Sequence, residues 1–137
     1  MKKFRYGLEN VLQLKKFNEE ECRMALGIAI SELNLIENKI KDTAIRHHQA
    51  SSERLNDPAR MMIWSNYLTR LEYEAEQLAE QAAQAEIVVE EKRALYMEAF
   101  KDLKALEKLK ENKAKEYKKE MEAKESAEID EVFARRF

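Results

Sequence analysis

The chain has 137 residues, 38% of them charged and 45% hydrophobic, and its net charge is −2. With only two glycines and one proline there are few places where a helix can end, so the composition favours long helices over a compact globular core. The near-neutral balance argues against a nucleic-acid or membrane-surface binder, and a single cysteine excludes an intrachain disulfide.

The first expected element is a helix over about residues 4–54. Its apolar residues recur in alternating steps of three and four, which is typical of a coiled coil. Between Cys22 and Ile40 all of these core positions are apolar. Lys15 and Glu19 interrupt the pattern closer to the N-terminus. The core positions are Leu8, Leu12, Lys15, Glu19, Cys22, Leu26, Ala29, Leu33, Ile36, Ile40 and Thr43.

A break in the helical pattern is expected at about residues 55–57. Asn56, Asp57 and Pro58 are turn and capping residues. Asp57 is the expected N-cap of the next helix, with Pro58 at its first position, where the missing N–H costs nothing. Because the connection is so short, the two helices should be antiparallel neighbours.

The second expected helix covers about residues 58–134 and carries the same spacing, with Lys92 and Tyr96 as the departures from apolar character. The sequence therefore predicts an all-α fold. It is an antiparallel two-helix coiled-coil hairpin, with a longer second helix projecting at the C-terminus, in a single domain over residues 1–137. The core positions are Trp64, Leu68, Leu71, Ala75, Leu78, Ala82, Ala85, Val89, Lys92, Tyr96, Ala99, Leu103 and Leu106.

The register of the hairpin follows from the position of its turn. A turn centred near residue 56 places residue i opposite about residue 111 − i. This register sets Leu33 near Leu78 and Glu19 opposite Lys92, so that the polar interruptions of the two helices coincide. Beyond about Leu109 the second helix is expected to have no partner within the chain.

Candidate chemistry in the sequence is sparse. His47 and His48 are adjacent on a helix and diverge by about 100°, so they cannot both ligate one metal ion without help from other residues. Cys22 fits the core as a small apolar residue. No glycine-rich phosphate loop precedes a helix, and the acidic side chains lie on solvated faces. We expect no enzymatic activity, no cofactor and no metal site.

Membrane and export signals also look absent from the sequence. The apolar run over residues 24–30 is far shorter than a membrane span, and no secretory signal is apparent at the N-terminus. A cytoplasmic location is the expectation. The apolar residues Met61, Met62, Ile63, Trp64 and Tyr67 leave two interpretations open: they cap the end of the hairpin, or they form a docking surface.

Three sequence strings go beyond composition and periodicity. The chain opens with Phe4-Arg5-Tyr6-x-Leu8-Glu9-x-Val11-Leu12, and Tyr67-Leu68-x-x-Leu71-Glu72 follows the turn. It closes with Leu106-Glu107-Lys108-Leu109-Lys110 and then Ile129-Asp130-Glu131-x-Phe133-Ala134. In this order the strings resemble the FliJ family of flagellar export proteins, and the resemblance covers essentially the whole chain.

The resemblance implies a non-catalytic, cytoplasmic component of the flagellar type III export apparatus, with a role in flagellum biogenesis, chemotaxis and motility. Members of the family form a coiled coil similar to the central stalk of rotary ATPases. The implied partners are the hexameric export ATPase, the export-gate protein FlhA and export chaperones. The implied location is peripheral at the inner membrane, through the export apparatus and without direct membrane insertion. No nucleic-acid partner is implied.

The resemblance also suggests residues for two partners. The ATPase would bind near both termini, at Phe4, Arg5, Leu8, Val11, Leu12, Ile129, Asp130, Glu131 and Phe133. The export gate would bind near the turn, at Trp64, Tyr67, Leu71 and Leu78. Two other functions stay open: a general chaperone or escort for export substrates or their chaperones, and a plain coiled-coil tether.

Overall fold

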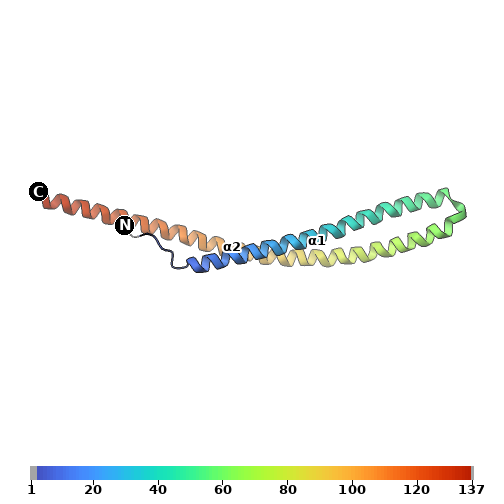
Figure 1. Cartoon of the computed structure of the whole chain (residues 1–137), viewed down its shortest axis with the longest axis horizontal. Coiled ribbons are helices and arrows are strands. Elements are labelled where there is room, and N and C mark those ends of the chain that lie inside the picture. Colours follow the sequence, from blue (N-terminus) through green and yellow to red (C-terminus); the bar gives the residue numbers. More distant parts are fainter. Residues whose placement is uncertain (1–2, 137) are drawn as a thin grey trace. The chain divides into compact units, whose positions relative to one another are not determined.

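The computed structural model describes residues 3–136, and almost all of them lie in two α-helices (Figure 1). Helix α1 covers Glu9–Asn56, and helix α2 covers Met61–Arg136. A short 3₁₀ helix, η1, covers Pro58–Arg60 between them, and the described residues include no strand. The predicted all-α hairpin with a longer second helix is confirmed. Met1, Lys2 and Phe137, which the predicted domain includes, lie outside the described residues.

Helix α1 begins at Glu9, later in the sequence than the apolar pattern suggested, and residues 3–8 before it are not helical. The amide of Glu9 donates to the carbonyl of Tyr6 at 3.1 Å, and the amide of Leu12 donates to the carbonyl of Leu8 at 2.8 Å. These bonds occupy two of the amides that the first turn of a helix leaves unpaired. The segment of residues 3–8 is called the N-terminal arm below.

At the connection, Asp57 precedes η1 and Pro58 takes its first position. The Asp57 side chain makes no capping hydrogen bond. Instead its carbonyl accepts the amide of Arg60 at 3.2 Å, and its carboxylate lies 3.9 Å from the Arg60 guanidinium. The first turn after the break is therefore tight 3₁₀ helix that belongs to the connection, and the α-helical hydrogen bonding starts only at Met61.

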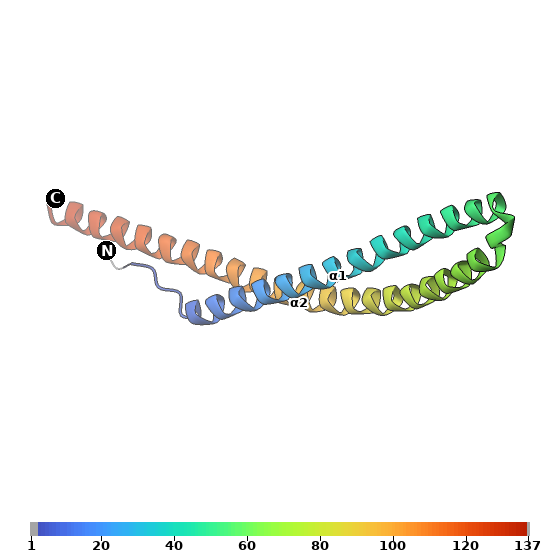
Figure 2. The ribbon, with the colours of Figure 1, turned by 45° about the vertical axis from the view of Figure 1, so that its right-hand side comes forward.

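The chain divides into two compact units. The hairpin unit comprises Cys22–Tyr96, and the terminal unit comprises Met1–Glu21 together with Met97–Phe137. In the hairpin unit, α1 and α2 run side by side from the connection in both views (Figures 1 and 2). The core cluster nearest the connection consists of Ala50, Leu68 and Leu71.

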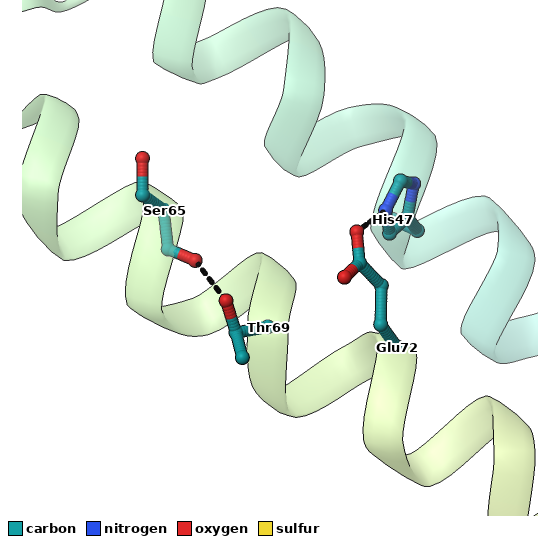
Figure 3. Close-up of polar contacts among 4 residues, drawn as sticks. All are labelled: His47, Ser65, Thr69 and Glu72. Carbon is teal, nitrogen blue, oxygen red and sulfur yellow. Dashed lines mark hydrogen bonds and ion pairs between the residues drawn. The ribbon is translucent and has the colours of Figure 1, made fainter.

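The register of the hairpin unit is marked by an interhelical polar pair. Nε2 of His47 on α1 lies 3.2 Å from Oε1 of Glu72 on α2 (Figure 3). Residue i therefore lies opposite about residue 118 − i, which is one heptad from the register predicted above. That prediction is wrong because η1 is part of the connection. The centre of the turn therefore lies about half a heptad later in the sequence than predicted. Moving the centre of an antiparallel hairpin shifts the residue opposite any given position by twice that amount, which is about one heptad.

The terminal unit has the same register. Nζ of Lys15 lies 3.6 Å from a carboxylate oxygen of Asp102, and Leu12 and Leu103 are buried. Glu19 lies level with Ala99, and both residues are buried. The expected pairing of Glu19 with Lys92 is therefore wrong.

Candidate functional site

The N-terminal arm lies along α2 in the terminal unit. The ring of Phe4 is 5.6 Å from that of Tyr117, centroid to centroid, and the Tyr6 hydroxyl donates to the carbonyl of Leu106 at 3.3 Å. The expectation that α2 has no partner beyond Leu109 is therefore wrong. A non-helical segment advances about twice as far per residue as a helix, so the arm reaches farther along α2 than continued helix would.

An ion pair anchors the arm where α1 begins. Nζ of Lys110 lies 2.8 Å from a carboxylate oxygen of Glu9. The hydrogen bond from Lys110, assisted by one from Gln13, holds the pKa of Glu9 below its ordinary value. Both side chains are partly exposed, so the pair fixes position more than it adds stability.

The expected ATPase-binding residues near the N-terminus differ in accessibility. Leu12 is buried in the helix–helix core, with 1% of its surface exposed. Leu8 and Val11 are exposed, as is Arg5, while Phe4 is half-buried against Tyr117. Leu8, Val11 and Arg5 can therefore touch a partner directly, whereas Leu12 can act only by supporting the helix pair.

An apolar face lies near the end of α2. Ile129, Val132 and Phe133 are spaced i, i+3 and i+4, so they share one side of the helix, and each exposes more than half of its surface. Glu125, Glu128 and Arg136 border them. We call Ile129, Val132 and Phe133 the C-terminal apolar face. The resemblance did not suggest Val132, although helical spacing would have found it.

The other two expected residues of this segment point elsewhere. Asp130 and Glu131 are exposed, but they follow Ile129 by one and two positions and so lie about 100° and 200° around the helix from it. Glu131 pairs with Arg135 at 3.4 Å along the helix. A single flat partner therefore cannot contact all four expected residues of this segment.

The structure does not bring the two groups of expected ATPase-binding residues together. Phe4 contacts Tyr117, and Ile129 lies twelve residues farther along α2. At 1.5 Å per residue that separation is about 18 Å. The terminal unit thus presents two surfaces, the arm and the C-terminal apolar face, and one compact site is not formed.

Near the connection, Trp64 and Tyr67 pack against the core cluster of the hairpin unit. Their rings are 6.3 Å apart in an edge-on arrangement, and the Arg70 guanidinium lies 5.7 Å from the Tyr67 ring centroid. The indole N–H of Trp64 is buried and has no hydrogen-bond partner among the described residues. Both rings are half-buried, so each keeps an edge that a partner could contact.

The remaining two expected gate-binding residues are inaccessible in this arrangement. Leu71 and Leu78 are buried, with 3% and 6% of their surfaces exposed, and they hold the two helices together. The large apolar side chains exposed around the connection are instead Leu55, Met62 and Ile63, each by more than 65%. Those residues do not cap the hairpin, which leaves them as candidates for contact with a partner.

No group of three histidine, cysteine, aspartate or glutamate side chains within residues 3–136 is placed to hold a metal ion. No helix in that range is long and apolar enough to cross a membrane. What the structure offers a partner is exposed apolar side chains on helices.

A comparison with protein families gives one finding. The family model described as flagellar FliJ protein matches residues 4–137, which is nearly the whole chain. No curated protein and no solved structure gives a significant match.

Proposed function

Because the chain belongs to the FliJ family of flagellar export proteins, we propose that it is a stalk-like coupler, which binds the hexameric export ATPase through its terminal unit and the export gate through its hairpin unit. The family supplies the premise that the protein is a non-catalytic component of flagellar export. The proposal adds the two partners, the export ATPase and the gate protein FlhA. It also adds a cytoplasmic location at the inner membrane. Contact with export chaperones belongs to the same proposal.

The observation that carries the ATPase half of this proposal is the C-terminal apolar face. Ile129, Val132 and Phe133 expose 55%, 53% and 57% of their surfaces. Three large apolar side chains on one side of a helix, bordered by charged residues, form the pattern with which a helix inserts into a groove of another protein. The exposed N-terminal residues Leu8 and Val11 offer a second, separate contact.

For the gate half, the support comes from the connection. Trp64 and Tyr67 keep an exposed edge, and Leu55, Met62 and Ile63 are exposed nearby in the sequence. Methionine side chains are adaptable, and methionine and aromatic residues are both enriched where proteins contact each other. We assign the gate contact to these residues. Leu71 and Leu78 would contribute by keeping the hairpin closed.

The test is ATP hydrolysis by the cognate export ATPase, titrated with the full chain. We expect stimulation by the wild type and at least a tenfold weaker apparent affinity for Ile129→Asp combined with Phe133→Asp, because the charges would have to be desolvated in the contact. The matched control is Ile87→Asp, because Ile87 is exposed to a similar degree (58%) but lies in the hairpin unit. No stimulation by the wild type, or equal loss in the control, would contradict the coupler and favour an escort or a tether.

A further inference from the structure

Three of the expected ATPase-binding residues have the spacing of a helical row. Phe4, Leu8 and Val11 follow one another by four and three residues. In a helix this spacing sets three side chains in line along one face. In the structure only Val11 lies within α1, which begins at Glu9, because the N-terminal arm is not helical. The row is therefore interrupted before it reaches Phe4.

Contacts with α2 inside the terminal unit hold the arm in this non-helical form. The ring of Phe4 packs against that of Tyr117, with 5.6 Å between the ring centroids. The Tyr6 hydroxyl donates to the carbonyl of Leu106 at 3.3 Å. Phe4 is half-buried, whereas Leu8 exposes 42% of its surface. The docked arm thus keeps one apolar member of the row on α2 while the next faces solvent.

The arm is packed on α2 at points and not along its whole length. A hollow of about 470 Å³ lies between the arm and α2, where Leu109 and Lys113 help to line it. Another hollow of about 600 Å³ borders the arm beside Glu9 and Lys110. Because its packing depends on two aromatic side chains, the arm opens at a lower free-energy cost than the paired helices do.

An arm that has left α2 can continue α1 as helix. It contains no proline, and neither Gly7 nor any other described residue has a positive φ, so nothing in its backbone bars helical geometry. Because glycine is unfavourable inside a helix, Gly7 makes this extension depend on a partner that binds it. Continued helix would add Phe4 to the row of Leu8 and Val11, and such a row is how a helix inserts into a groove.

We propose that the docked arm is an autoinhibitory latch on the ATPase contact. Its packing on Tyr117 and its hydrogen bond to Leu106 keep Phe4 on α2, and the arm must leave α2 before Phe4, Leu8 and Val11 can bind as one helical row. The apparent affinity of this contact is reduced by the fraction of protein whose arm is free, so weakening the latch raises it. This inference rests on the proposed ATPase contact and adds its regulation.

The latch is tested first without the ATPase. Tyr117→Ala removes the ring on α2 and leaves the sequence of the arm unchanged, so limited trypsin digestion should cut after Arg5 several times faster than in the wild type. Tyr73→Ala is the matched control, because it removes a ring that is 64% exposed on α2, and it should be cut at the wild-type rate. Circular dichroism should show equal helix content in all three proteins. An unchanged rate for Tyr117→Ala would overturn the proposal.

The second test titrates ATP hydrolysis by the cognate export ATPase with the same proteins and with Tyr6→Phe, which removes only the hydroxyl. Tyr117→Ala and Tyr6→Phe should each reach half-maximal stimulation at a concentration about three to ten times lower than the wild type, because each loses one contact of the latch. Tyr73→Ala should match the wild type. If the wild type stimulates and these two variants need the same or a higher concentration, the latch is overturned and the coupler stands. If the wild type does not stimulate, the coupler fails and the latch fails with it.

Discussion

The rings of Phe4 and Tyr117 lie 5.6 Å apart, and this contact fixes the far end of the N-terminal arm to α2. The arm also donates one hydrogen bond, from the hydroxyl of Tyr6 to the carbonyl of Leu106. With so few contacts, a short non-helical segment should detach more readily than the helices separate. Whether Phe4 is available to a partner therefore depends on this aromatic pair.

Phe4→Ala should release the arm while leaving the helices intact. An aromatic pair contributes about 0.5–1.5 kcal/mol beyond the area it buries, so its loss shifts the arm toward detached forms. Limited trypsin digestion should then cut after Arg5 several times faster than in the wild type. Phe17→Ala, which removes a ring that is 58% exposed on α1, is the control and should not change the rate.

The Glu9–Lys110 ion pair predicts a pH dependence of stability. Lys110 holds the pKa of Glu9 below its ordinary value of 4.5, so ionised Glu9 stabilises the folded state above that pH. The contribution is lost as the pH falls through the folded pKa. In urea unfolding, the wild type should be more stable than Glu9→Gln at pH 7, and the difference should vanish in acid. A difference that is constant with pH would contradict this assignment.

The register of the hairpin unit can be tested by a disulfide. Thr43 and Ala75 line the same groove between α1 and α2. In a Cys22→Ala background, Thr43→Cys with Ala75→Cys should therefore form an intrachain disulfide on oxidation. The control pair is Thr43→Cys with Leu68→Cys, which the register predicted from the sequence would bring together. It should stay reduced, because one heptad displaces the partner by about 10 Å.

Replacing the buried acid of the terminal unit should stabilise the protein. Glu19 occupies a heptad core position and exposes 8% of its surface. Glu19→Leu adds apolar burial at this core position, so we expect a gain of about 1–2 kcal/mol in the free energy of unfolding. Thermal unfolding should show a higher Tm for Glu19→Leu. Glu98→Leu, at an exposed position of α2, should leave Tm nearly unchanged.

The sequence predicted the helices well because heptad spacing and scarce turn residues constrain them strongly. Leu12, Leu68 and Leu71 are core positions in the pattern and are buried in the structure. The register could not be predicted in the same way. A pattern that repeats every seven residues looks the same after a shift of seven, and the choice depended on whether η1 belonged to the helix or to the connection.

The candidate surfaces were harder to predict than the helices. Family strings name residues without saying which way they face, so the expected ATPase-binding residues included both buried Leu12 and exposed Ile129. Helical spacing supplies the missing direction, and it adds Val132 to the C-terminal apolar face. The contact of the arm with Tyr117 had no sequence signal, because it depends on the non-helical backbone of residues 3–8.

Trp64 is the only tryptophan in the chain, and its buried indole N–H lies beside the connection of the hairpin unit. The protein therefore carries its own optical reporter at the end assigned to the export gate. An indole shielded from water emits at shorter wavelength than a hydrated one. A gate partner that separates the two helices there should expose Trp64 to water and shift its fluorescence emission to longer wavelength. A partner that only covers Trp64 should shift this emission to shorter wavelength. Intrinsic tryptophan fluorescence can thus distinguish the two modes of docking without an attached dye.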